Sequence, residues 1–166
     1  MVAVIEVRIA SLAVDSRGQP VVVLAPASAE QGARRLLPIW IGVPEATAIM
    51  LAVAGEAPSR PQVYDLMTTL LDRLDADVEK VVVTRLEGGT FFAEITLATP
   101  SGHEVVDARP SDSIALAVRT GAPVFVAEAV FAEAGMPDAD GAGDEQSQLA
   151  AFHEFLDDVE PDDFRG

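Results

Sequence analysis

The sequence predicts an α+β fold in which a mainly antiparallel or mixed β-sheet packs against three helices. This domain is expected over residues 1–131, with an acidic linker and tail over residues 132–166. Three observations predict it. Segments with strand composition outnumber segments with helical periodicity, and turn-forming clusters join most strands to the next, as in hairpins. Hydrophobic residues make up 49% of the 166 residues, which is enough for one core of ordinary size.

The first part of the chain is expected to form three strands. Residues 2–14 are rich in β-branched and aliphatic side chains, and the turn-forming run at 15–20 leads into a similar segment at 21–24, so a hairpin is predicted. Residues 36–42 are apolar but too few for a buried helix, and Pro38 within them is typical of an edge strand. Trp40, the single tryptophan, is expected in the core.

Two helices are expected next. The first begins at Pro44-Glu45, because proline at the first helical position and an acid in the first turn are both favourable, and it ends at Gly55. The second has the strongest apolar periodicity in the chain, which predicts one buried face with Tyr64 at its border. The apolar residues of this face are Val63, Leu66, Met67, Leu70, Leu71 and Leu74.

A second hairpin is expected in the middle of the chain. Residues 79–86 and 90–99 are its strands, and Gly88-Gly89 supplies the positive φ values that a tight turn requires. Residues 103–108 then add a third antiparallel strand, ending at a helix start.

The last helix of the domain is predicted over residues 111–120. It is apolar nearly all round, so it should be covered on more than one side, and a strand at 124–126 follows it. Beyond the Gly/Pro/Asp-rich linker at 135–143, apolar residues recur at helical spacing among acids, which predicts an amphipathic helix in the tail. They are Leu149, Phe152, Leu156 and Val159.

Composition excludes several classes of function. The chain has no cysteine, which excludes disulfides, Cys-ligated metals and thiol nucleophiles, and it has neither a P-loop nor a GxGxxG motif, so no nucleotide cofactor is expected. No signal peptide and no membrane-spanning run is recognisable, so a cytoplasmic protein without membrane contact is expected. The formal net charge of −16 repels nucleic-acid backbones unless a local basic patch or a bridging metal offsets it.

The densest polar cluster lies between the third strand of the meander and the last helix. One interpretation is that Asp107 and Asp112 bind a divalent metal while Arg109 binds phosphate, and the free backbone amides at the helix start form an anion pocket. The alternative is structural: Ser111 or Asp112 caps the helix, and Arg109 pairs with a carboxylate at the corner. Spacing alone favours the structural interpretation, because helix caps are far commoner than metal sites.

The second helix begins in a parallel way, with Arg60, Pro61 and then Asp65. If both helix starts face one cleft, Arg60 and Asp65 could join the Asp107–Asp112 cluster in a mixed-charge pocket suited to a metal and a phosphodiester. Glu45 is a further metal-ligand candidate. Two separate salt-bridged corners, with Glu45 serving only the helix dipole, are the alternative.

Four motifs in this order resemble the bifunctional nuclease domain family over residues 1–131. They are LPIWIG at 37–42 with Glu45-Ala46, Arg60-Pro61 with Asp65-Leu66, GTFFA at 89–93, and DARPSDSIALA at 107–117. The resemblance implies a compact α+β domain, often a homo-oligomer, in a family named for cleaving DNA and RNA. Family members commonly have Thr-His where this chain has Val63-Tyr64, and near neutral pH a tyrosine can only offer a hydrogen bond there.

Two hypotheses of function follow. The first is a nuclease assisted by Mg²⁺ or Mn²⁺, with Asp65, Asp107 and Asp112 as catalytic candidates, Arg60, Arg109, Ser111 and Tyr64 as substrate-binding candidates, and Asp107, Asp112 and Glu45 as metal ligands. The second is a non-catalytic oligomeric or regulatory module whose acidic tail binds a basic protein partner. The net charge of −16, with twelve acids and one base in residues 128–166, and the absence of the family's histidine motivate the second hypothesis.

Overall fold

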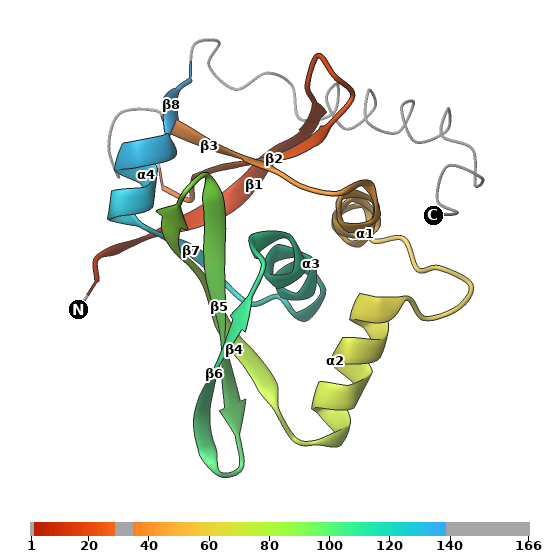
Figure 1. Ribbon diagram of the computed structural model, residues 1–166. Helices are drawn as coiled ribbons and strands as arrows, with labels where there is room; N and C mark the ends of the chain where they lie inside the picture. Colours follow the sequence, from red (N-terminus) through yellow and green to blue (C-terminus); the bar gives the residue numbers. More distant parts are fainter. Residues whose placement is uncertain (1, 29–34, 139–166) are drawn as a thin grey trace.

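The computed structural model describes residues 2–28 and 35–138 of the chain. They form one mixed eight-stranded sheet and four helices, so the predicted α+β class is confirmed (Figure 1). The strands are β1 (Val4–Val14), β2 (Pro20–Pro26), β3 (Arg35–Trp40), β4 (Asp77–Glu87), β5 (Thr90–Thr99), β6 (Gly102–Ala108), β7 (Val124–Ala127) and β8 (Met136–Pro137). The helices are α1 (Val43–Ala54), α2 (Val63–Arg73), α3 (Pro110–Thr120) and α4 (Glu128–Ala134). None of these helices is both long enough and apolar enough to cross a membrane.

The sheet has the strand order β6-β5-β4-β7-β1-β2-β3-β8. Both predicted hairpins, β1–β2 and β4–β5, are present, and β4–β7 is the single parallel pair among the strands described. Gly88 and Gly89 have φ values of 56° and 79° at the β4–β5 turn, as the predicted hairpin requires. Figure 1 shows β4–β6 running across the direction of β1–β3, so the sheet is strongly twisted.

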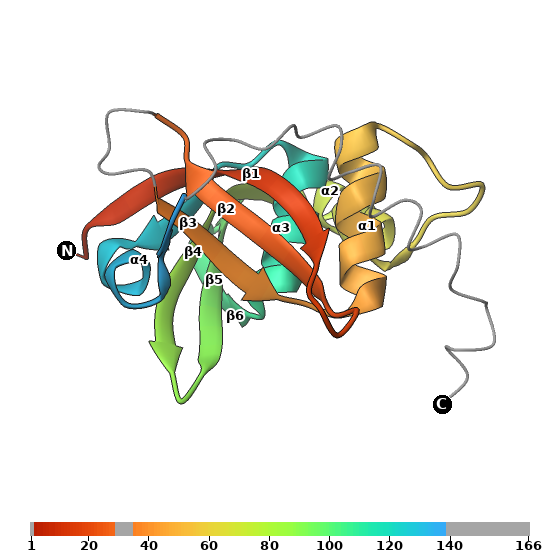
Figure 2. The ribbon, with the colours of Figure 1, turned by 90° about the horizontal axis from the view of Figure 1, so that it is seen from above.

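Helix α3 occupies the centre of the core, as its all-round apolar sequence predicts. Seven of its residues, including Ile114 and Leu116, are buried between the sheet and the neighbouring helices. Figures 1 and 2 show α4 at one end of the molecule and α1 and α2 at the other, with α3 between them. The start of α3 is therefore next to both α1 and α2, which is where the candidate site forms.

Two elements were not predicted. Helix α4 buries Val130 and Phe131, which are adjacent in sequence and so leave no helical periodicity to detect. Strand β8 has two residues and exists by pairing with Arg35 and Leu36 of β3. The boundary placed at residue 131 falls within α4, and the predicted amphipathic helix of the tail lies outside the described residues.

Helix α2 forms where it was predicted, but the prediction of which face it buries is wrong. Tyr64, expected at the border, is the buried residue of this helix, and Met67 and Leu71 are half-buried. The other four apolar residues are more than half exposed: Val63, Leu66, Leu70 and Leu74. The apolar residues of α2 extend over more of the helix circumference than α3 and the sheet can cover. Only the part that contacts α3 and the sheet is buried.

Trp40 is also not in the core. Its side chain is half-exposed at the end of β3, and Nε1 donates a 3.0 Å hydrogen bond to Asp15 Oδ2 in the β1–β2 turn. The backbone N–H groups of Gln19 and Arg17, followed by Trp40, hold the pKa of the Asp15 carboxyl below its usual value. This contact ties the hairpin turn to the strand that leads into α1.

Candidate functional site at the start of helix α3

Arg109 is the central residue of the candidate site. It is the N-cap of α3, and Pro110 follows at the first helical position, so the chain turns here from strand β6 into the helix. Its Nε donates to Asp112 Oδ2 at 2.7 Å and its Nη2 donates to Asp112 Oδ1 at 2.9 Å. This bidentate pair fixes the plane of the guanidinium, which is 64% exposed.

Glu45 binds the same guanidinium from α1. Arg109 Nη2 also donates to Glu45 Oε1 at 2.9 Å, whereas Nη1 makes no hydrogen bond within the described residues. Gly42, the N-cap of α1, leaves room for this carboxylate, because a Cβ at position 42 would collide with Glu45 Oε2. The two carboxylates, Asp112 first and Glu45 second, raise the pKa of Arg109 above its usual value.

Tyr64 joins α2 to this group. Its hydroxyl donates a 2.6 Å hydrogen bond to Asp112 Oδ1, and its ring is buried. Burial, together with the negative charge of Asp112, raises the pKa of Tyr64 far above its usual value, so the phenol is a neutral donor. Burial also raises the pKa of Asp112, but the hydrogen bonds from Arg109 and Tyr64 outweigh burial and leave that pKa below the usual value. We call Glu45, Tyr64, Arg109 and Asp112 the Arg109 cluster.

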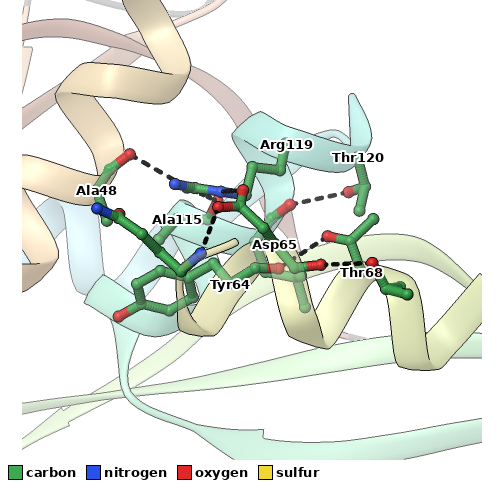
Figure 3. A network of polar contacts seen from close by, with 10 residues as sticks. Ala48, Tyr64, Asp65, Thr68, Ala115, Arg119 and Thr120 are labelled. Carbon is green, nitrogen blue, oxygen red and sulfur yellow. Dashed lines mark hydrogen bonds and ion pairs between the residues drawn. The ribbon is translucent and has the colours of Figure 1, made fainter. Parts of the chain in front are cut away.

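A second ion pair, between Arg119 and Asp65, lies next to Tyr64, as Figure 3 shows. Arg119 Nε donates to Asp65 Oδ1 at 2.8 Å, and Arg119 Nη1 donates to the carbonyl oxygens of Ala48 and Ala115. The Arg119 side chain is only 9% exposed, and its guanidinium carbon lies 5.3 Å from the centre of the Tyr64 ring. Arg119 therefore connects α1, α2 and α3 beneath the Arg109 cluster.

Asp65 serves this second ion pair rather than the Arg109 cluster. It closes a capping box with Gln62 at the start of α2, and the Gln62 N–H, followed by Arg119, holds the pKa of the Asp65 carboxyl below its usual value. Its carboxylate lines a pocket of about 310 Å³ between α2 and the segment that follows α1, with Gly55, Pro58, Thr69 and Arg119 also on its wall.

The remaining predicted residues lie apart from the Arg109 cluster. Asp107 pairs with Glu94 across β5–β6, whereas the next residue, Ala108, pairs with Ala93, which is buried on the helix side. Since successive strand residues point to opposite faces, Asp107 lies on the face away from the helices. Ser111 is 6% exposed in α3, and Arg60 is exposed in the loop before α2, where no ion pair involves it within the described residues.

Arg119 was not among the site residues predicted from the sequence. The available signal was its position seven residues after Asp112, two turns along the same face of α3, with Ala115 between them. Two polar residues on one face of an otherwise apolar helix indicate polar partners on the element that packs against that face. In the structure these partners are Tyr64 and Asp65 of α2.

A family model described as "Bifunctional nuclease domain" matches residues 22–139, a range that includes all residues of the Arg109 cluster. The chain belongs to the bifunctional nuclease domain family. An uncharacterized protein of Mycobacterium tuberculosis strain H37Rv is 40% identical to it over 96% of this chain and 98% of its own length.

Two plant members are similar over a shorter span. Bifunctional nuclease 2 of Oryza sativa subsp. japonica is 30% identical over 68% of this chain, and Bifunctional nuclease 1 of Arabidopsis thaliana is 32% identical over 58%. The chain spans about a third of the length of these plant relatives (34% and 31%).

In this member of the bifunctional nuclease domain family, the Arg109 cluster combines one exposed guanidinium, two carboxylates and one neutral phenol. An exposed and fixed guanidinium can bind a phosphate oxygen, an ionised carboxylate can accept a proton, and the phenol can only donate a hydrogen bond. Within the described residues, no group of three or more Asp, Glu or His side chains is arranged to hold a metal by itself.

Proposed function

We propose that this chain cleaves phosphodiester bonds of nucleic acid, with Arg109 binding the phosphate. The observation that carries the proposal is that Arg109 is held in place by Asp112 and Glu45, yet its side chain remains exposed and its Nη1 makes no hydrogen bond within the part of the chain that the structure describes. A guanidinium fixed in this way loses little conformational entropy when it binds a phosphate oxygen. Membership of the bifunctional nuclease domain family supports the same chemistry.

Asp112 and Tyr64 are assigned complementary roles in this proposal. The lowered pKa of Asp112 keeps its carboxylate ionised at neutral pH, so it can hold the Arg109 guanidinium and serve as a ligand for a divalent cation. The raised pKa of Tyr64 keeps its proton on the phenol, which holds Asp112 in position. Tyr64 is thus a positioning residue that orients the Asp112 carboxylate.

Mg²⁺ or Mn²⁺ is part of the proposal, with Glu45 and Asp112 as its protein ligands. Magnesium is commonly held by one or two carboxylates together with substrate phosphates, so two carboxylates beside a phosphate-binding arginine fit that arrangement. Such an ion would act as a Lewis acid on a phosphoryl oxygen. Asp107 lies on the opposite face of the sheet and is left out of the ligand set.

The test is cleavage of labelled single-stranded and double-stranded DNA and RNA by extensively purified protein. Reactions contain Mg²⁺, Mn²⁺ or a chelator, and the parent chain is compared with Arg109→Ala and Asp112→Asn. Both variants are expected to lose metal-dependent cleavage while keeping their circular dichroism spectrum. Arg85→Ala and Asp77→Asn are the matched controls, because both residues lie on β4, away from the cluster.

Two outcomes would contradict the proposal. Cleavage that survives in Arg109→Ala and Asp112→Asn would point to a contaminating nuclease or to another site. Cleavage lost in Asp107→Asn but kept in Asp112→Asn would place the chemistry on the opposite face of the sheet.

A regulatory module without catalysis is the second candidate function. The observation that favours it is that Asp65, Asp112 and Glu45 each bind an arginine of the same chain, as corner-locking residues do. This candidate predicts that no purified preparation cleaves nucleic acid with Mg²⁺ or Mn²⁺, while Asp112→Asn changes only the stability of the chain. Loss of cleavage in a variant with an unchanged melting temperature would exclude it.

A further inference from the structure

The pocket beside the Asp65–Arg119 ion pair has no part in the proposed cleavage site. It has a volume of about 310 Å³ and lies between α2 and the segment that follows α1. This volume is at the lower end of the range for small-molecule pockets, which combine apolar walls with a few fixed polar groups. The apolar wall here is formed by Ala52, Ala57, Pro58 and Pro61. The polar groups on the wall therefore decide which molecule the pocket fits.

Arg119 offers a hydrogen-bond donor at this pocket. Its Nε and Nη1 bind groups of the chain, whereas Nη2 makes no hydrogen bond to any residue that the structure describes. The side chain is only 9% exposed, yet no buried side-chain nitrogen or oxygen in residues 2–28 and 35–138 lacks a partner. Nη2 is therefore accessible. Because Arg119 lines the pocket, a molecule bound there can accept a hydrogen bond from Nη2.

Asp65 offers acceptors next to this donor. Nε and Nη2 share one edge of the planar guanidinium, and the bond from Nε to Asp65 Oδ1 holds the carboxylate at that edge (Figure 3). Oδ1 and Oδ2 each accept one hydrogen bond, from Arg119 and from the Gln62 N–H. A carboxylate has about four acceptor positions, so each oxygen of Asp65 can accept a further bond from a ligand. The pocket thus presents a fixed donor beside fixed acceptors.

The charges of the pocket disfavour a phosphate group as its occupant. Asp65 already neutralises Arg119, and Glu56 adds a second carboxylate to the wall. An anion would therefore be repelled, whereas a neutral group with N–H donors would not. A flat, neutral ring with N–H donors beside a carbonyl oxygen matches both the charge and the hydrogen-bonding groups. Among the four common nucleobases, guanine alone has two N–H donors beside a carbonyl oxygen on one edge.

We propose that this pocket binds a guanine base. The base O6 accepts a hydrogen bond from Arg119 Nη2, its N1–H and N2–H donate to the carboxylate of Asp65, and the apolar wall covers the ring. The base belongs either to a nucleic-acid strand or to a free guanine nucleotide, and the first source rests on the proposed function. Arg119 lies two turns after Asp112 on α3, about 10 Å along the helix, which a short single strand bound at Arg109 can span.

The first test measures binding alone, by isothermal titration calorimetry of the full chain with guanosine monophosphate. The adenosine, cytidine and uridine monophosphates are expected to bind more weakly by about tenfold or more, because each leaves the Asp65 carboxylate without an N–H partner. Inosine monophosphate lacks only the N2 amino group and is also expected to bind more weakly. Ala57→Phe fills the pocket and should abolish binding. Ala54→Phe is the matched control, because Ala54 is also exposed but is not part of the wall.

The second test identifies the source of the base. Cleavage sites are mapped on single-stranded RNA and DNA that contain all four bases, with Mg²⁺ or Mn²⁺. If the strand supplies the base, the parent and Ala54→Phe cut at a fixed distance from a guanine, and Ala57→Phe loses this preference. A strand without guanine is then cut equally by all three proteins. Cuts that ignore guanine, together with binding of guanosine monophosphate, assign the pocket to a free nucleotide.

The outcomes distinguish this inference from the proposed function. A protein that cleaves no nucleic acid, but binds guanosine monophosphate in a manner that Ala57→Phe abolishes, refutes the proposed function and supports the guanine pocket. A protein that cleaves nucleic acid, but neither binds guanosine monophosphate nor prefers guanine, supports the proposed function and overturns the guanine pocket. Equal affinity for all the nucleotides, or binding that persists in Ala57→Phe, also overturns it.

Discussion

The phenol of Tyr64 and the carboxylate of Asp112 form the direct link between the starts of helices α2 and α3, with 2.6 Å between the two oxygens. The residues are 48 positions apart in the sequence, and each has a further arginine contact. Asp112 binds Arg109, which is exposed, and the Tyr64 ring lies beside Arg119, whose side chain is only 9% exposed. The link therefore connects the exposed part of the candidate site to its buried support.

Tyr64→Phe removes this hydrogen bond and little else. We expect the free energy of unfolding to fall by about 1.5–3 kcal/mol, the usual contribution of a hydrogen bond to a charged group. Urea denaturation measures the change. Thr69→Val is the control, because that hydroxyl is exposed and binds only its own helix, at the Asp65 carbonyl. Equal stability of Tyr64→Phe and the parent would show that the Tyr64–Asp112 hydrogen bond makes no net contribution to the free energy of unfolding.

Asp112 should make the stability of the chain depend on acid pH. Its pKa is lower in the folded chain than in the unfolded one, so its contribution is fully present above the unfolded pKa of about 3.9 and is lost as the pH falls through the folded value. The difference in unfolding free energy between the parent and Asp112→Asn is therefore expected to be largest at neutral pH and to shrink below about pH 4. Chemical denaturation of both proteins from pH 7 to pH 3 measures it, and a constant difference would contradict the prediction.

The sequence predicted the fold well wherever local chemistry determines it. Glycines at the β4–β5 turn and Pro44 at the start of α1 act within a few residues, and the structure has these elements where they were expected. The buried side of α2 could not be predicted, because its apolar arc includes more side chains than its neighbours can cover. Only the packing of Tyr64 against α3 shows which part of the arc is inside.

For the candidate site too, local contacts could be predicted from the sequence, and contacts that depend on the packing of distant segments could not. The pairing of Arg109 with Asp112 follows from their spacing at a helix start, whereas Glu45 reaches the same guanidinium from 64 residues away. Asp107 was grouped with Asp112 because β6 has no clear alternation of apolar and polar residues from which to read its face. Its register with Glu94 is a property of the assembled sheet.

Arg119 is expected to be the most costly charged residue to remove among those near the site. Arg119→Met should lower the free energy of unfolding by about 2–4 kcal/mol, because it breaks the ion pair with Asp65 and removes the hydrogen bonds that Arg119 donates to two backbone carbonyls. Arg85→Met is the matched control. Its ion pair with Glu87 is exposed and should contribute less than about 1 kcal/mol. Thermal or urea denaturation compares the two variants. Similar losses of unfolding free energy would mean that the contacts of Arg119 stabilise the fold no more than an exposed ion pair does.

Gly42→Ala should separate Glu45 from Arg109 without disturbing the fold. The new Cβ would collide with Glu45 Oε2, and that carboxylate is the end of a flexible side chain that can turn away. The backbone of Gly42, at φ −76°, accepts alanine without strain. We therefore expect stability within about 1 kcal/mol of the parent, together with loss of the Glu45–Arg109 ion pair. A double-mutant cycle of Glu45→Gln and Arg109→Ala measures the coupling free energy between these two residues. This coupling should be measurable in the parent and should vanish in the Gly42→Ala background. Coupling that survives in Gly42→Ala would show that Glu45 reaches Arg109 without the space this glycine provides.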